Sequence, residues 1–292
     1  MLQFKSLPSG LRYWEKLSAE PTVAIIFIHG VGTSCDYWLE VAHALPDGVS
    51  AVGFDLPGSG KSPDPPKDDD FRILASFSLK LMKPIVPRAP QVVIVGHSLG
   101  SLIASQMVRQ DPSVASLLIL VDPVLFRAEG VLTHLTESIR NPRYLTLVLS
   151  QLGGAMLPGP WTSHILRNSA IRKIALAHQM GNGPDVDPST LRRCLSHTRG
   201  WPSFSPIAVV RAARTVRMRE IFSHVTVPVA VVKGERDPLT NEADLAELSS
   251  MCETLSVSVI PHAGHSPMLN LPKELITHIL AAIERAAQNG DV

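Results

Sequence analysis

Cysteine is scarce in this 292-residue sequence, and its three residues, Cys35, Cys194 and Cys252, are far apart. An odd number of cysteines without C-x-x-C spacing indicates neither a disulfide framework nor a zinc site. An excess of charge of one sign is also missing, because the formal net charge is only +1. Such a balance gives no general attraction to nucleic acid. We therefore expect a globular protein of a reducing compartment, without a metal and without a nucleic-acid partner.

Long apolar runs are missing as well. Residues 1–8 contain no apolar core of a secretory signal, and residues 289–292 match no address signal. The longest apolar runs, at 23–28 and 117–121, are far too short to cross a bilayer. The sequence therefore predicts a cytoplasmic protein without a transmembrane segment, as a monomer or a homodimer.

Short apolar runs alternate with helix-compatible segments over most of the chain. Strands buried on both faces of a parallel sheet have this near-continuous apolar character, and the alternation is typical of an α/β fold. Asp36 is the expected cap of the first helix. The expected strands are 4–7 and 11–17 (an N-terminal hairpin), 22–28, 49–54, 92–95, 114–121, 227–233 and 255–260. The expected helices are 36–45, 74–86 (which Pro84 should end or kink), 101–108, 242–252 and 272–288.

The alternation stops between about 124 and 222, where only helical patterns appear, separated by breaks rich in proline and glycine. We therefore predict a core domain formed by 1–122 and 223–292, interrupted by an all-helical cap at 123–222. The cap holds 13 Lys and Arg against 5 Asp and Glu, whereas the rest of the chain is net acidic. These basic residues either coat solvated helix faces and partly pair with the acidic core, or attract an anionic substrate or surface.

One motif joins an apolar run directly to a helical pattern. Gly96-His97-Ser98-Leu99-Gly100 follows Val92-Val93-Ile94-Val95 and precedes the helical segment 101–108. A G-x-S-x-G motif between a strand and a helix indicates a sharp turn that exposes the serine hydroxyl, with flanking glycines where strand and helix approach closely. Ser98 is the candidate nucleophile, provided that a base lies near it.

This arrangement resembles the α/β-hydrolases that use a serine nucleophile. The resemblance covers nearly the whole chain apart from the insertion. It implies a mostly parallel, eight-stranded sheet flanked by helices, a helical cap after the sixth strand, and no required cofactor. Relatives that use an aspartate at the turn, the haloalkane dehalogenases and epoxide hydrolases, are excluded because this chain has Ser98 there.

The partners that a serine nucleophile needs follow in the order acid, then histidine. Asp237 follows the strand 227–233 in Gly234-Glu235-Arg236-Asp237, and His265 follows the strand 255–260 in Ala263-Gly264-His265. Both would lie at the carboxyl edge of the sheet, where open α/β sheets build their sites. The alternatives are Glu235, Asp244 or Asp122 as the acid and His262 as the base.

The resemblance also implies a pair of backbone N–H groups that bind a developing oxyanion. The expected donors are Leu99 and Val31, with Gly30 or Gly32 as alternatives in the same loop. We expect His29 to brace this loop rather than to take part in the reaction. The motif Asp55-Leu56-Pro57-Gly58-Ser59-Gly60-Lys61-Ser62 resembles a family loop that supports the floor of the site. The candidate substrate-pocket residues are His29, Gly30 and Gly32 of the oxyanion loop and, in the predicted cap, Trp201 and Phe204. The two aromatic residues would line either this pocket or the core of the cap.

The sequence therefore predicts a serine hydrolase that cleaves a carboxylic ester, a thioester or a lactone through an acyl-enzyme on Ser98. Its partner would be a small acyl substrate, apolar or anionic. Two other classes remain open on the same fold. One is an acyltransferase, lyase or cyclase that keeps the three residues, and the other is a non-catalytic ligand-binding protein.

Overall fold

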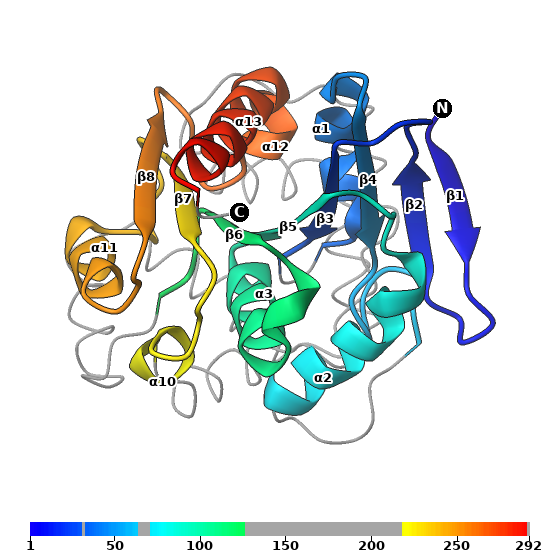
Figure 1. The fold of residues 1–292 in the computed structure, drawn as a ribbon, viewed down its shortest axis with the longest axis horizontal. Helices are drawn as coiled ribbons and strands as arrows, with labels where there is room; N and C mark the ends of the chain where they lie inside the picture. The colour runs from blue at the N-terminus through cyan, green and yellow to red at the C-terminus, as the bar shows by residue number, and fades with distance from the viewer. Residues whose placement is uncertain (31–32, 64–70, 126–217, 291–292) are drawn as a thin grey trace, which may run out of the picture.

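An eight-stranded sheet organises the chain (Figure 1). The computed structural model describes residues 1–30, 33–63, 71–125 and 218–290. The strands run in the order β1-β2-β4-β3-β5-β6-β7-β8, with β3 to β8 parallel and β2 antiparallel to both of its neighbours. Their bounds are β1 Gln3–Ser6, β2 Arg12–Lys16, β3 Val23–Ile28, β4 Val49–Phe54, β5 Gln91–His97, β6 Leu117–Val121, β7 Val229–Gly234 and β8 Leu255–Ile260.

The most apolar strands lie in the middle of the sheet and the less apolar ones lie at its edges. Every residue of β4 and β6 is buried, and β3, β5 and β7 are buried over most of their length. β1 and β8 lie at the two edges and keep exposed residues, such as Phe4 and Val257. The apolar runs therefore occupy the middle of the sheet, where helices cover both faces.

Helices form a layer on each face of the sheet (Figure 1). α1, α12 and α13 pack on one face in a core with β3 and β5, whereas α2, α3 and α10 share a second core on the other face. Apolar residues three or four apart give α13 its buried side. The helices are η1 Cys35–Trp38, α1 Leu39–Ala44, α2 Phe71–Met82, η2 Lys83–Ile85, α3 Leu99–Gln110, η3 Pro112–Val114, α10 Met218–Phe222, α11 Glu242–Ser249, α12 Pro267–Asn270 and α13 Pro272–Gln288.

The predicted fold class is confirmed, including the hairpin of β1 and β2, and some element ends differ. The strand expected at 114–121 begins only at Leu117, because Pro112 opens the short helix η3. The helix expected at 74–86 is α-helical only to Met82, since Pro84 interrupts it. Asp36 as a helix cap was wrong: Ser34 caps η1 with its hydroxyl, and Asp36 pairs with an arginine instead.

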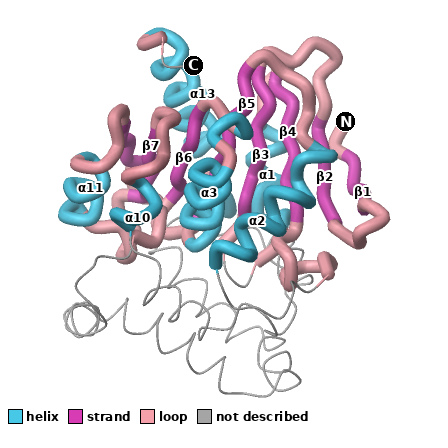
Figure 2. The backbone as a smooth tube through the Cα atoms, turned by 60° about the horizontal axis from the view of Figure 1, so that its bottom comes forward, coloured by secondary structure: helices cyan, strands magenta, loops and turns pink. Residues whose placement is uncertain are grey.

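The predicted cap at 123–222 lies almost entirely outside the described residues, which resume with α10. The described residues stop shortly after β6 and resume with α10, before β7 (Figure 2). Among the helices that the structure describes, none is long and apolar enough to cross a membrane.

Candidate active site

Ser98 stands at the sharp turn between β5 and α3. Its backbone has φ 54° and ψ −124°, a conformation that non-glycine residues rarely adopt. The two flanking glycines are required by close packing. A Cβ on Gly96 would lie 2.6 Å from the backbone oxygen of Gly100, and a Cβ on Gly100 would lie 2.4 Å from that of His29. The motif therefore forms the strand–turn–helix that its spacing predicts.

The three predicted catalytic side chains are joined by hydrogen bonds. Nε2 of His265 lies 3.0 Å from Oγ of Ser98, and Nδ1 lies 2.9 Å from Oδ1 of Asp237. Both distances are within hydrogen-bond range. With Nδ1–H donating to the carboxylate, Nε2 presents its lone pair to the serine hydroxyl. An imidazole in this orientation can take the proton of Ser98.

The loop after β7 holds Asp237 as an anion. Oδ1 also accepts from the N–H of Leu239 (3.0 Å), and Oδ2 accepts from that of Thr240 (3.1 Å). Burial alone would raise the pKa of Asp237, but the charge and hydrogen bond of His265 and these donors hold the pKa below its ordinary value. The hydroxyl of Thr240 donates to the backbone oxygen of Pro123 (2.9 Å), which fixes this loop to the end of β6.

His97, the residue before Ser98, supports the segment that carries His265. Its Nε2 lies 2.7 Å from the backbone oxygen of His265, so Nε2–H donates to that oxygen. Burial and the nearby His265 lower the pKa of His97 to about 3, so the ring is neutral at physiological pH. Its position in the motif was evident in the sequence, but no sequence pattern pointed to this contact.

The alternative acids and base occupy other positions. His262 is exposed, and its backbone N–H donates to the side chain of Glu235 (2.8 Å). Asp244 lies in the first turn of α11. Asp122 is fully buried at the end of β6, and its Oδ1 accepts from the N–H of Gly234 (2.7 Å). Asp237 is the candidate acid that accepts a hydrogen bond from His265, the histidine that also reaches Ser98.

The predicted oxyanion donors can be followed only in part. Leu99 is the first residue of α3, where backbone N–H groups have no partner inside the helix. Val31 and Gly32 lie outside the described residues. His29 is buried and braces the loop before them: its Nε2 accepts from the N–H of Leu56 (2.9 Å), so Nδ1–H donates to the backbone oxygen of Gly30 (2.8 Å).

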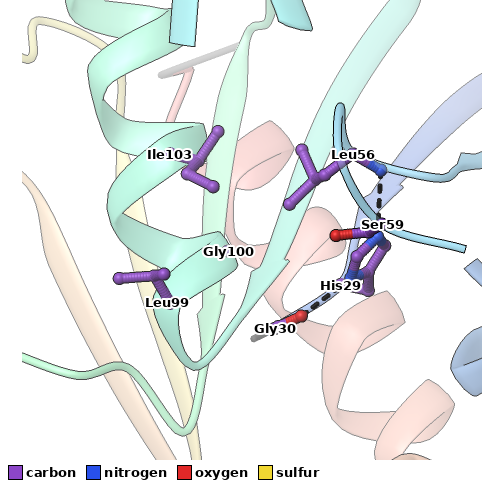
Figure 3. A pocket seen from close by; sticks show the side chains of 7 residues that line it. All are labelled: His29, Gly30, Leu56, Ser59, Leu99, Gly100 and Ile103. Carbon is purple, nitrogen blue, oxygen red and sulfur yellow. Dashed lines mark hydrogen bonds between the residues drawn. The ribbon is translucent and has the colours of Figure 1, made fainter. Parts of the chain in front are cut away.

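A small hollow lies beside the start of α3 (Figure 3). It is a shallow recess, too small to hold a water molecule, and is partly open to solvent. Leu56 and Ile103 face each other across it (Figure 3). The lining is mostly apolar and includes Gly30 and Leu99, both of which were predicted near the oxyanion. The lining residues are His29, Gly30, Leu56, Ser59, Leu99, Gly100 and Ile103. Trp201 and Phe204, the other predicted pocket residues, lie outside the described residues.

A buried ion cluster of Arg12, Asp36 and Asp55 was not predicted from the sequence. Arg12 of β2 pairs with Asp36 (2.8 Å) and with Asp55 (3.3 Å). Asp55 also accepts from the N–H groups of Cys35 (2.8 Å) and Lys61 (2.9 Å). A single arginine in a hairpin gives no signal in the sequence, since most arginines are exposed. The cluster connects the N-terminal hairpin to the segments that follow β3 and β4.

One group of potential metal ligands lies in the described part of the chain. Asp122, Asp237 and His265 each offer an atom, and these atoms lie within 4.8 Å of one another. However, both ring nitrogens of His265 are engaged by Ser98 and Asp237. A histidine ligand needs a free nitrogen lone pair. The cluster therefore fits the orientation of an imidazole better than the coordination of a metal.

Comparisons with known proteins agree with this architecture. A family model described as "Alpha/beta hydrolase family" matches residues 25–277. The pimeloyl-[acyl-carrier protein] methyl ester esterase of Aeromonas salmonicida is 26% identical over 256 residues, which are 86% of this chain and 92% of that protein. An esterase structure from Exiguobacterium antarcticum superposes with a TM-score of 0.70 at 16% identity, covering 97% of this chain and 100% of that one.

A further match is partial. The dihydrolipoyllysine-residue acetyltransferase component of the acetoin cleaving system from Cupriavidus necator is 34% identical over 116 residues. These residues are 40% of this chain and only 30% of that protein.

Proposed function

Because the chain belongs to the alpha/beta hydrolase family, we propose that it is a serine hydrolase that cleaves a carboxylic ester, a thioester or a lactone. The observation that carries the proposal is the hydrogen-bonded series from Asp237 through His265 to Ser98, at 2.9 and 3.0 Å. The esterase similarities support the ester as the first substrate class to test.

The proposed reaction has two steps. Oγ of Ser98 attacks the acyl carbon while its proton passes to Nε2 of His265. The tetrahedral intermediate then breaks its bond to the leaving group, which takes that proton from His265. Water, deprotonated by the same nitrogen, attacks the acyl-enzyme and releases the acid and free Ser98. Asp237 orients the imidazole and stabilises its positive form throughout.

The developing oxyanion requires donors, and we assign them to the backbone N–H groups of Leu99 and Val31. The position of Leu99 at the first turn of α3 supports this assignment, because the N-terminus of a helix favours negative charge. Removal of a single such donor typically costs about 3–4 kcal/mol of transition-state stabilisation.

We assign substrate selection to the hollow beside α3 together with the cap at 123–222. The apolar side chains of Leu56 and Ile103 line this recess and would contact the acyl group from the core domain. The cap, with Trp201 and Phe204, would supply the remaining walls, and its basic composition suits an anionic substrate.

The central experiment is labelling with a fluorophosphonate, which reacts preferentially with an activated serine. The wild type should be labelled on the peptide that carries Ser98, and Ser98→Ala and His265→Ala should not. His262→Asn is the matched control, because this histidine is exposed and precedes His265 by three residues. Unlabelled wild type, or labelling of the same peptide in Ser98→Ala, would falsify the proposal. A panel of esters, thioesters and lactones then identifies the substrate class.

Acyl transfer is the second candidate, favoured by the partial match to an acetyltransferase component. The first step would be the same, and an alcohol or thiol would replace water in the second. Product analysis in the presence of a thiol acceptor separates the two: a hydrolase releases the free acid, whereas a transferase forms the new thioester.

A further inference from the structure

Asp122 combines full burial with an unusual hydrogen-bond pattern. It directly follows β6, with a left-handed backbone (φ 42°). Its Oδ1 accepts from the N–H of Gly234 (2.7 Å). Its Oδ2 is also buried, yet no N–H or O–H of the described residues donates to it. A buried carboxylate oxygen without a donor is strongly unfavourable.

A second carboxyl group lies close to that of Asp122. Asp122, Asp237 and His265 offer atoms that all lie within 4.8 Å of one another. Two carboxyl groups this close, buried together, do not both ionise. Asp237 accepts hydrogen bonds from His265, Leu239 and Thr240. Asp122 accepts one, from Gly234. The negative charge therefore belongs on Asp237 and the shared proton on Asp122.

The other charged group near Asp122 does not change this distribution. Lys233 of β7 weakly favours an ionised Asp122, but its Nζ donates to the backbone oxygen of Thr240 (2.7 Å). Burial and the charge of Asp237 outweigh Lys233 and the N–H of Gly234, and they raise the pKa of Asp122 well above its ordinary value. Because Oδ1 accepts from Gly234, the proton of Asp122 lies on Oδ2, and the resulting O–H group needs an acceptor.

We propose that Asp122 is a neutral carboxylic acid that donates from Oδ2 to the carboxylate of Asp237, and so is a positioning residue for the acid that orients His265. This inference rests on the proposed function, because Asp237 has its role only there. It explains why Oδ2 finds no donor: Asp122 is itself the donor. It also assigns the end of β6 a part in the site without making Asp122 an alternative acid.

Two substitutions separate a neutral Asp122 from an ionised one. Asp122→Asn keeps an oxygen for Gly234 and an N–H for Asp237, whereas Asp122→Ala keeps neither. With any ester that the wild type cleaves, we expect kcat/KM to fall about tenfold in Asp122→Ala, the loss of roughly one hydrogen bond, and to be largely restored in Asp122→Asn. The acid limb of the pH–rate profile should coincide in Asp122→Asn and the wild type, because no charge is removed.

The opposite result overturns the proposal. If Asp122 is ionised, Asp122→Asn removes a negative charge near His265, and the acid limb moves to lower pH. If Asp122→Asn is as impaired as Asp122→Ala, a hydrogen bond from this position to Asp237 does not matter.

Infrared difference spectroscopy detects whether Asp122 carries a proton, and the measurement does not depend on catalysis. The carbonyl band of an unionised carboxylic acid should be present at neutral pH, absent in Asp122→Asn and retained in Glu235→Gln, a matched change of an exposed carboxyl on the neighbouring loop. A spectrum of Asp122→Asn identical to the wild type in this region overturns the proposal. A wild type that shows the band but neither reacts with fluorophosphonate nor hydrolyses esters would instead contradict the proposed function alone.

Discussion

Nε2 of His97 lies 2.7 Å from the backbone oxygen of His265, although 168 positions separate the two residues in the chain. The turn that presents Ser98 therefore also holds the segment that carries the proposed base. The centroids of the two imidazole rings are 5.0 Å apart. Because the hydrogen bond joins the two segments, a shift of either one would change the distance between His265 and Ser98.

This contact predicts a loss of activity larger than the loss of stability. In His97→Phe the ring stays aromatic but cannot donate, so we expect kcat/KM to fall about tenfold. The melting temperature should fall only modestly, because the lost donor to the backbone oxygen of His265 is partly offset by removal of the buried Nδ1 of His97, which has no partner among the described residues. Ester hydrolysis and thermal unfolding measure the two effects.

His97→Gln is the matched variant, since its amide N–H reaches toward the same oxygen. It should recover part of the activity. Equal activity in His97→Phe and His97→Gln would show that the hydrogen bond has no part in positioning His265.

A second prediction concerns Asp237 and acid. Asp237→Asn should lower kcat about 10⁴-fold, because Nδ1 of His265 loses the acceptor that fixes its proton. The pKa of Asp237 is lowered to about 2 in the folded protein, so its ionisation stabilises the fold fully above its ordinary pKa, and this contribution is lost as the pH falls from that value through the lowered pKa.

The stability of the two proteins should therefore converge in acid. The free energy of unfolding of the wild type, measured with urea, should exceed that of Asp237→Asn at pH about 7, and the difference should shrink below about pH 4. A difference that stays constant or grows in acid would contradict a lowered pKa.

The third prediction concerns the buried ion cluster of Arg12, Asp36 and Asp55. Arg12→Met leaves Asp36 and Asp55 buried without their cation, and we expect a loss of about 3–5 kcal/mol in the free energy of unfolding. Lys5→Met is the matched control, because it removes an exposed ion pair with Glu15 from the same hairpin and should cost less than about 1 kcal/mol. Similar losses in the two variants, measured by urea unfolding, would refute this view of the cluster.

Much of the fold could be predicted from the sequence, because burial on both faces leaves a clear pattern. Runs such as 117–121 are apolar throughout, and only the middle of a sheet accommodates such strands. Ser98, Asp237 and His265 were predicted for a related reason. Each follows a strand, and the carboxyl ends of parallel strands meet at one edge of the sheet. The structure brings the three together, and their roles remain predictions.

What could not be predicted depends on approaches between distant segments. The contact of His97 with His265, the position of Asp122 beside Asp237, and the burial of Arg12 all require the packed sheet. None changes the local periodicity of the sequence. The ends of helices were also missed where a cap decides them. Both Ser34 and Asp36 are residue types that cap helices, and the structure uses the hydroxyl of Ser34. The predicted cap helices lie outside the described residues.

The topology of the sheet has a consequence for a chain that is still being made. Ser98 and its turn are complete once β6 has joined β5, but His265 follows β8, the last strand, at the opposite end of the sheet from the hairpin. Nearly the whole polypeptide must therefore be made before Ser98 can meet the imidazole of His265. On the proposed function, a nascent or truncated chain would carry the hydroxyl of Ser98 without the base that activates it.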